Sequence, residues 1–236
     1  MSTTRSILVT GSNQGLGMHT VHQLAATPNV LVFMGSRQIS AAEEALARFQ
    51  SDVHPTSAVV PVQLDITDET SISLTFDFIG SYLKTKTLEG LDVLINNAAI
   101  DNPTFHETFQ VNLFGTVAVT EAFRPLLNNG GAILNISSFA GSISLFTKQP
   151  APRIHLAYVT SKAALNRLTA HLAADEMQKG SGIQVVSICP GYNATGMNAY
   201  SGTMAPSEGC KVIVTAALNK ELKSGTFFNK DGDLEW

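Results

Sequence analysis

The sequence is poor in charged residues, and this shortage excludes some classes of function. Charged residues make up 14% of the 236 residues and the formal net charge is −4, so the chain has no basic field to attract nucleic acid. Hydrophobic residues make up 44%, a share that favours a packed core over a disordered chain. At this length we expect one domain, residues 1–236, rather than two.

Cysteine is also scarce. Cys189 and Cys210 show neither the paired spacing of a metal site nor the density of a disulfide framework, so we interpret both as small buried thiols. The six histidines have no metal-ligand spacing either. We therefore expect no catalytic metal.

Long hydrophobic runs are missing as well. No apolar run reaches the length that crosses a bilayer, and the first residues lack the apolar core and cleavage site of a signal peptide. Two matches to the N-glycosylation pattern, at Asn135 and Asn193, follow no secretion signal and are interpreted as chance. We expect a cytoplasmic protein that binds neither membrane nor nucleic acid.

Short apolar runs alternate with amphipathic segments along the whole chain, which is typical of crossover units on a parallel sheet. Strands are expected at 6–10, 30–34, 58–62, 91–96, 132–137 and 183–188, with a possible seventh at 226–228. Helices are expected at 15–26, 41–50, 69–83, 109–127, 156–178 and 207–219. Ser40 and Asp68 suit helix caps. The pattern predicts a single α/β domain with a mostly parallel sheet of six to seven strands and helices on both faces.

Two segments interrupt this alternation. Residues 146–155 contain two prolines and are expected to form a loop. Residues 190–206 are rich in Gly, Asn, Ser and Thr and follow the carboxyl end of a strand, where open parallel sheets bind ligands. We interpret the substrate loops, about 139–157 and 190–206, as walls of one site.

The turn Thr10-Gly11-Ser12-Asn13-Gln14-Gly15-Leu16-Gly17 joins the first expected strand to the first expected helix. Gly11 permits a tight turn, Gly15 lets the backbone approach a pyrophosphate, and Gly17 lets the helix pack on the strand. Backbone N–H groups and the helix dipole favour phosphates at this end. An ordinary Gly-rich turn is the alternative, but the strand and helix on either side favour a dinucleotide site.

Tyr158 and Lys162 stand four residues apart in an expected helix, so both project from one face. An ammonium about 4 Å from the phenol contributes on the order of 4 kcal/mol at an effective dielectric of ~20. That energy would lower the phenol's pKa of ~10 by roughly three units before desolvation. We expect an acidified phenol beside a bound dinucleotide, able to give a proton to a carbonyl oxygen.

Four motifs occur in one order: Gly11-xxx-Gly15-x-Gly17, Asn96-Asn97-Ala98, Tyr158-xxx-Lys162 and Pro190-Gly191. Across nearly the whole chain this arrangement resembles the short-chain dehydrogenase/reductase family. Asn13-Gln14-Gly15-Leu16-Gly17 and the ending Gly225-Thr226-Phe227-Phe228 resemble its carbonyl-reductase-like branch. The resemblance implies a doubly wound Rossmann-type domain with no separate substrate domain.

The resemblance also implies roles for individual residues. Ser138, the second serine of Asn135-Ile136-Ser137-Ser138, would hydrogen-bond the substrate oxygen. The backbone carbonyl of Asn112 would hold a water on a proton path to the lysine, with a helix-packing amide as the alternative. The expected catalytic set is therefore Ser138, Tyr158, Lys162 and Asn112.

By the same resemblance, Asp65 and Ile66 would flank the adenine, Asn97 would touch the adjacent ribose, and Thr195 would meet the nicotinamide amide. After the second strand the chain reads Met34-Gly35-Ser36-Arg37, with no carboxylate to bind a ribose hydroxyl. Arg37 offers a fork of donors to a 2′-phosphate, so NADP(H) is the expected cofactor, and a solvated surface arginine is the alternative. The expected cofactor-binding set is Gly11, Asn13, Gln14, Gly15, Leu16, Gly17, Ser36, Arg37, Asp65, Ile66, Asn97, Ala98, Pro190, Gly191 and Thr195.

The chain departs from the family pattern in two places. Ser138 and Tyr158 are 20 positions apart, a longer spacing than plain family members have, and Ala99 stands where the Asn-Asn-Ala motif usually continues with Gly. The longer loop leaves monomer or homo-oligomer undecided. His155 within it is interpreted as a solvated loop residue, with substrate contact as the alternative.

Residues 197–204 are expected to form a substrate lid with hinge freedom at Gly196 and Gly202. The candidate pocket-lining residues, each with core packing as the alternative, are apolar and include no charged clamp; they are Phe146, Tyr192, Met197, Tyr200 and Met204. The leading hypothesis is NADPH-dependent reduction of a hydrophobic ketone or aldehyde, with the proton supplied by Tyr158. The alternatives are a secondary-alcohol dehydrogenase in a biosynthetic pathway and a non-catalytic dinucleotide-sensing protein.

Overall fold

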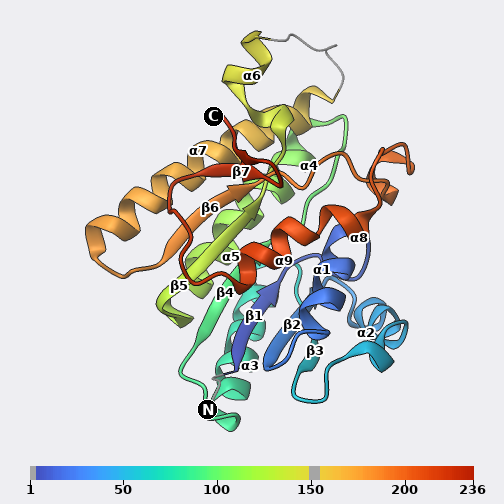
Figure 1. Ribbon diagram of the computed structural model, residues 1–236, viewed down its shortest axis with the longest axis vertical. Coiled ribbons are helices and arrows are strands. Elements are labelled where there is room, and N and C mark those ends of the chain that lie inside the picture. The colour runs from blue at the N-terminus through green and yellow to red at the C-terminus, as the bar shows by residue number, and fades with distance from the viewer. Residues whose placement is uncertain (1–3, 149–154) are drawn as a thin grey trace.

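The computed structural model describes residues 4–148 and 155–236, which form one sheet with helices packed on both faces (Figure 1). The eight strands lie in the order β3-β2-β1-β4-β5-β6-β7-β8. Their bounds are β1 Arg5–Val9, β2 Val30–Ser36, β3 Ala58–Gln63, β4 Leu91–Asn96, β5 Leu127–Ile136, β6 Gln184–Ile188, β7 Phe227–Asn229 and β8 Gly232–Asp233.

Strands β1 to β7 pair in parallel, and β8 pairs antiparallel with β7. The predicted α/β fold with a mostly parallel sheet is confirmed. The predicted number of six to seven strands differs by β8, a two-residue strand that turns back on β7 where the backbone N–H of Asp231 donates to Asn229 Oδ1 at 2.8 Å. Two residues are too few to show a strand period in a sequence.

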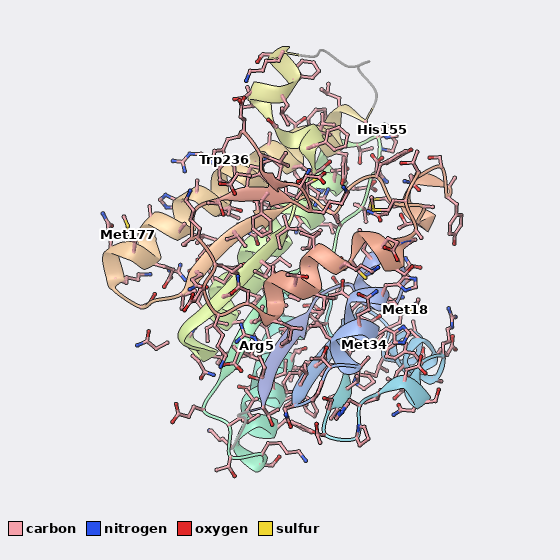
Figure 2. All side chains as sticks on the ribbon, in the orientation of Figure 1. Arg5, Met18, Met34, His155, Met177 and Trp236 are labelled. Atoms are coloured by element: carbon pink, nitrogen blue, oxygen red, sulfur yellow. The ribbon has the colours of Figure 1, made fainter. Side chains whose placement is uncertain are left out.

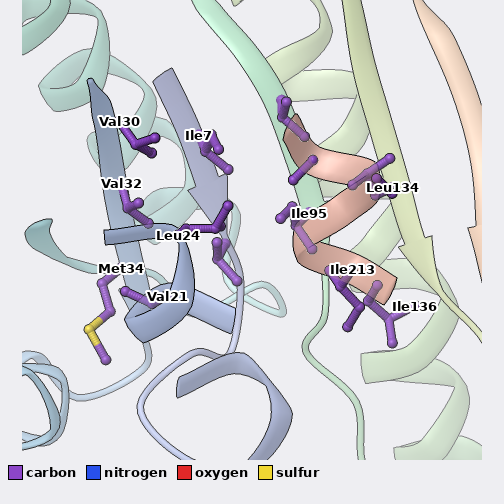
Figure 3. Packing of buried hydrophobic residues seen from close by; sticks show 14 of the residues in the cluster. Ile7, Val21, Leu24, Val30, Val32, Met34, Ile95, Leu134, Ile136 and Ile213 are labelled. Carbon is purple, nitrogen blue, oxygen red and sulfur yellow. The ribbon is translucent and has the colours of Figure 1, made fainter. Parts of the chain in front are cut away.

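The two faces of the sheet carry separate hydrophobic clusters. In β1, Ile7 and Val9 point to one cluster and Leu8 to the other, as the two-residue period of a strand requires. The first cluster is covered by α1 (Gly15–Ala25), α2 (Ile39–Ala47) and α9 (Lys211–Leu218), and Figure 3 shows its interdigitated side chains. The opposite face is covered by α3 (Glu69–Thr85), α5 (Thr116–Phe123) and α7 (Leu156–Lys179).

Two helix boundaries test the predicted caps. Asp68 precedes α3 and its side chain accepts a hydrogen bond from the backbone N–H of Thr70 at 2.9 Å, so this cap is confirmed. The Ser40 cap is wrong, because α2 begins at Ile39 and follows Gln38. The serine lies inside the helix rather than before it.

The expected helix at 109–127 is divided into segments. It comprises α4 (Phe105–Phe109), a π-helical turn Gln110–Gly115, α5, and a 3₁₀ turn Arg124–Leu126. The expected helix at 207–219 is divided into α8 (Pro206–Gly209) and α9. A π-helical turn inserts an extra residue into a helix and is often found at a functional site.

The prediction of a loop at 146–155 is wrong at its start, because α6 covers Ile143–Lys148. Residues 149–154 of that prediction lie outside the described residues. The main-chain carbonyl of Trp236 accepts a hydrogen bond from the backbone N–H of Ser144 at 2.9 Å, and that of Glu235 accepts one from Ser142 Oγ at 2.7 Å. Through these contacts, residues far away in the sequence hold α6 in place. No helix in the described part of the chain is long and apolar enough to cross a membrane.

Candidate active site

The motifs meet at the carboxyl edge of the sheet, where the strand order reverses between β1 and β4. The Gly-rich turn follows β1, Asn96 ends β4 and Asn97 follows it, Ser138 follows β5, and Pro190 follows β6. Helix α7 lies against this part of the sheet and presents Tyr158 and Lys162 in its first two turns (Figure 1). A crevice at such a reversal is the usual ligand position in an open parallel sheet.

Two glycines in the turn have no room for a side chain. Gly11 has φ +58°, and a Cβ there would lie 2.7 Å from the Cα of Ala98. A Cβ on Gly17 would lie 2.5 Å from Asn97 Nδ2. The turn after β1 is therefore packed directly on the segment that follows β4, and the positive φ of Gly11 fits the tight turn expected of it.

The first turn of α1 is suited to an anion. Helix α1 has no side-chain cap and no acidic residue in its first turn, so its backbone N–H groups and dipole are not neutralised by the chain itself. A Cβ on Gly15 would lie 3.5 Å from Thr195 Cγ2, which brings the predicted nicotinamide-side residue against this turn. Around them Asn13 and Leu16 are half-buried, Gln14 and Gly191 are exposed, and Pro190 is buried.

The Asn97 side chain contacts the Gly-rich turn, and the ribose contact expected of it stays a prediction. Its Nδ2 donates to the carbonyls of Thr10 and Gly11, both at 2.9 Å. The backbone N–H groups of Asn97 and Ala98 both donate to Thr10 Oγ1 at 3.0 Å. In the protein alone, the Asn97 amide group therefore holds the Gly-rich turn in place.

The region after β2 holds the residues expected to choose the cofactor. Arg37 is exposed, and in the described ranges no acidic side chain forms an ion pair with it. Ser36 is 2% exposed and its Oγ accepts from the backbone N–H of Gln38 at 3.3 Å, so its hydroxyl is directed into the chain. Asp65 Oδ1 accepts from Thr67, and Ile66 is buried. The Arg37 guanidinium is thus open to an incoming anion.

Tyr158 and Lys162 are brought together as the helical spacing predicted. Lys162 is only 3% exposed, and its Nζ donates to the carbonyl of Ile136 at 2.8 Å. The same Nζ lies 5.6 Å from the centroid of the Tyr158 ring. The buried ammonium is therefore anchored on the end of β5 beside the phenol.

The protein alone does not acidify the phenol as expected. Burial raises the pKa of Tyr158 to about 12, with further increases from the charges of Cys189 and Asp101, while a hydrogen bond with Ser138 acts in the opposite direction. Burial also lowers the pKa of Lys162 to about 8. Desolvation penalises the phenolate and the ammonium alike, and it is the largest cause of both pKa shifts.

The two serines at the end of β5 have different surroundings. Ser137 is 3% exposed and its Oγ donates to Asn166 Oδ1 at 2.5 Å, which makes it a contact between β5 and α7. Ser138 is half-buried, begins the 3₁₀ turn Phe139–Gly141, and interacts with Tyr158. Of the two hydroxyls, only that of Ser138 is placed with the phenol.

Asn112 lies in the π-helical turn and its side chain contacts two segments of the site. Its Oδ1 accepts from the backbone N–H of Ile100 at 2.8 Å, and its Nδ2 donates to the Ile100 carbonyl at 2.9 Å and to Ser161 Oγ at 3.0 Å. Thr116 Oγ1 donates to its main-chain carbonyl at 3.2 Å. The side chain thus joins the segment after β4 to the first turns of α7.

Two residues near the phenol were not assigned to the site from the sequence. Cys189 is 4% exposed, its Sγ accepts from the backbone N–H of Phe139 at 3.2 Å, and burial raises the pKa of its thiol. Asp101 pairs with His155, whose Nδ1 lies 2.6 Å from Asp101 Oδ2, so the solvated interpretation of His155 is incomplete. One sequence signal could have identified Asp101: it is a carboxylate five residues after Asn96, just beyond the carboxyl end of an expected strand.

The segment 190–206 is organised around Asn193, which is 4% exposed. Its Nδ2 donates to the carbonyls of Pro190 and Gly191 at 3.0 and 2.9 Å, and its own carbonyl accepts from Asn198 Nδ2 at 2.8 Å. A Cβ on Gly202 would lie 2.1 Å from the carbonyl carbon of Asn193, so this glycine serves tight packing rather than the hinge freedom expected of it. Both cysteines are buried free thiols, as predicted.

The comparisons with known proteins agree with this geometry. The model of the short chain dehydrogenase family matches residues 5–206. Short-chain dehydrogenase anuI of Penicillium roqueforti is 31% identical, with 89% of this chain and 87% of that protein aligned. Carbonyl reductase (NADPH) 1 of Macaca fascicularis is 30% identical, with 91% of each chain aligned.

A solved structure is similar over the full length. The NADPH-bound carbonyl reductase from chicken fatty liver superposes with a TM-score of 0.80 at 30% identity, covering 100% of both chains. Together with the family match, this likeness confirms the resemblance drawn from the four motifs. The chain belongs to the short-chain dehydrogenase family and, within it, to the carbonyl-reductase-like branch.

Proposed function

We propose that this oxidoreductase reduces a ketone or aldehyde to an alcohol, with NADPH as the hydride donor. The observation that carries the proposal is the meeting of Tyr158, Lys162 and Ser138 at the edge of the sheet that also holds the Gly-rich turn. The carbonyl reductases among its relatives are named for NADPH, which supports the choice of cofactor.

We call the proposed cofactor-binding residues the cofactor-binding band. Backbone N–H groups from Gly15 to Gly17 at the start of α1 would hold the pyrophosphate, Arg37 the 2′-phosphate, and Thr195 with Gly191 the nicotinamide end. Bound there, NADPH supplies the hydride. Asn97 would act mainly by fixing the Gly-rich turn, because its amide group donates to Thr10 and Gly11.

The proton comes from the chain's own groups. Tyr158 donates its phenolic proton to the carbonyl oxygen as that oxygen becomes negative, and Ser138 donates a hydrogen bond to the same atom. Lys162 stabilises the phenolate that remains, from its anchored position 5.6 Å from the ring centroid. Asn112 keeps this part of α7 in register with the segment after β4.

The raised pKa of Tyr158 favours reduction at neutral pH, because the phenol keeps the proton that it must donate. Oxidation of an alcohol needs the phenolate and should become faster as pH rises. Loss of the Lys162 proton, at a pKa of about 8, should make kcat/KM for reduction fall above that pH. Initial rates in both directions from pH 6 to 10 measure this, and a reduction rate that climbs through pH 9 would contradict it.

Arg37 should decide the preference for NADPH over NADH. Arg37→Ala removes charge-assisted hydrogen bonds worth about 1.5–3 kcal/mol, so KM for NADPH should rise about 10- to 100-fold while KM for NADH changes less than about twofold. Arg48→Ala, an exposed arginine at the end of α2, is the matched control. An unchanged cofactor preference in Arg37→Ala would remove this residue from cofactor selection.

The activity itself is tested by following NADPH consumption with a panel of hydrophobic ketones and aldehydes. Turnover of at least one group of carbonyl compounds is expected. Activity only with secondary alcohols and NADP⁺ would favour the dehydrogenase alternative. Cofactor binding without turnover in either direction would favour the sensing protein, although the meeting of Ser138, Tyr158 and Lys162 argues for catalysis.

A further inference from the structure

We propose that Asp101, held beside the reacting phenol and covered by His155, selects substrates by charge. It favours a carbonyl compound that carries a protonated amine and disfavours one that carries a carboxylate. The inference rests on the proposed reductase function and adds a substrate class to it. It also differs from the sequence prediction of a pocket without a charged clamp.

Asp101 is held by its neighbour in the chain. Ile100 gives both its backbone N–H and its carbonyl to the side chain of Asn112, at 2.8 and 2.9 Å. That side chain is in turn bonded to Ser161, three residues after Tyr158. The main chain just before Asp101 is therefore fixed relative to the catalytic turn of α7, and the pairing with His155 orients the carboxylate, as a selective contact requires.

The carboxylate lies near the reacting group, because its partner His155 stands three residues before Tyr158 at the start of α7. Asp101 is one of the charges that raise the pKa of Tyr158, and its side chain is only 15% exposed. A partly buried charge is screened less than a surface charge, so its sign matters to any substrate whose carbonyl oxygen contacts the phenol. A second negative charge on the substrate would be repelled there, and a positive one attracted.

His155 covers the carboxylate from the solvent side. Its Nδ1 lies 2.6 Å from Asp101 Oδ2, while its side chain is 54% exposed. Its backbone has φ 58° and ψ 37°, a left-handed conformation immediately before α7, and Figure 2 shows it on the same side of the molecule as the 190–206 segment. Within the described residues the ring makes no other hydrogen bond, so a substrate amine can replace it without breaking further contacts.

The other groups that face this position leave Asp101 as its main charge. The Lys162 ammonium is directed to the Ile136 carbonyl. The Cys189 thiol has a raised pKa, so it is neutral at pH 7 and adds its charge only at the alkaline pH where Tyr158 titrates. On α4, Glu107 accepts from Thr104 Oγ1 at 2.9 Å. Exposed apolar side chains of Phe105, Phe139 and Leu156 lie on elements around the site. An aromatic amino ketone combines the apolar body and the cation that such surroundings bind.

The test uses three aryl ketones that share one skeleton and end in a dimethylamino, an isopropyl or a carboxylate group. We would measure kcat/KM for each ketone with NADPH, and by calorimetry the Kd of each corresponding alcohol with the NADP⁺-loaded protein. The amine should be favoured over the isopropyl compound about tenfold, equivalent to about 1.4 kcal/mol. Asp101→Asn should reduce that ratio to within about twofold, and Asp77→Asn, on the exposed side of α3, should keep it.

Equal affinity for the amine and isopropyl compounds in the parent protein, or a full preference retained in Asp101→Asn, would overturn the proposal. The calorimetric ratio needs no turnover, so failure of the reductase proposal would show separately as absence of NADPH consumption. A second variant decides if Asp101→Asn does not fold. That variant is His155→Asn, because asparagine tolerates the left-handed backbone and lacks the imidazole ring that covers Asp101. It should raise the preference for the amine, and a lowered preference would contradict the proposal.

Discussion

Replacing Tyr158 by phenylalanine should lower kcat for carbonyl reduction by about 100- to 10,000-fold, the range that a general acid contributes. The change removes one hydroxyl and leaves the ring that lies beside Lys162. Among the described residues, Ser138 is the hydroxyl placed with the phenol, and an aliphatic hydroxyl is a much weaker acid than a phenol, so it does not replace the lost proton donor. Binding of NADPH should change little, since the cofactor-binding band does not include Tyr158.

Stopped-flow or steady-state NADPH consumption with a good substrate measures this effect, and fluorescence titration measures the affinity for NADPH. Tyr82→Phe is the matched control. Tyr82 belongs to α3 and packs on Phe33 in the second hydrophobic cluster, not among the proposed catalytic residues. Its kcat should stay within about twofold of the parent. A Tyr158→Phe protein with parental turnover would mean that the proton comes from elsewhere and would remove the central element of the proposed function.

Replacing Lys162 by methionine should reduce kcat by at least about 100-fold, because the phenolate left by proton transfer loses the neighbouring positive charge. Its effect on folding should be small at neutral pH. The parent confines an ammonium that is 3% exposed, at a cost that appears as the lowering of its pKa to about 8. The variant avoids that cost but leaves the Ile136 carbonyl without its donor, a loss of about 1–3 kcal/mol.

The same lowered pKa predicts how stability depends on pH. Between pH 8 and 10.5 the unfolded chain binds more protons at this lysine than the folded chain, so the parent's free energy of unfolding should rise across that window. The rise should be on the order of 3 kcal/mol and should be missing in Lys162→Met. The raised pKa of Tyr158 acts only above pH 10 and in the opposite direction.

Urea unfolding at pH 7 and pH 9.5 separates these contributions. At pH 7 the free energy of unfolding of Lys162→Met should lie within about 2 kcal/mol of the parent's value. At pH 9.5 Lys162→Met should be less stable than the parent. Lys84→Met, an exposed lysine on α3, should change stability little at either pH. Equal pH dependence in parent and Lys162→Met would show that the ammonium is not desolvated in the folded protein.

The spacing of residues along the sequence determined much of the site. The four-residue separation of Tyr158 and Lys162 places them on one helix face wherever that helix lies. Gly11 was expected to permit a tight turn and Gly17 to let the helix pack on the strand, and a Cβ at either position would lie within 2.7 Å of Ala98 or Asn97. Asp68 capped its helix as predicted because an N-cap bond spans only two residues.

Contacts across long sequence separations were not predictable in this way. Helix α6 was expected to be a loop at its last residues, and it is held by main-chain contacts with Glu235 and Trp236. Gly202 was expected to be a hinge, but packing on Asn193 closes the segment onto itself. The Asn97 amide holds the turn 86 and 87 residues before it, a contact that no local spacing predicted.

The sequence by itself determined the alternating fold, the phosphate-binding turn and the pairing of phenol with ammonium, because each depends on a period or spacing of a few residues. Only the tertiary structure decided how strongly these groups are desolvated, and so the direction of the Tyr158 pKa. It also decided that Asp101 and His155 meet beside the phenol. Burial and the distance between charges depend on which segments, far apart in the sequence, pack against one another. A local sequence pattern does not contain that information.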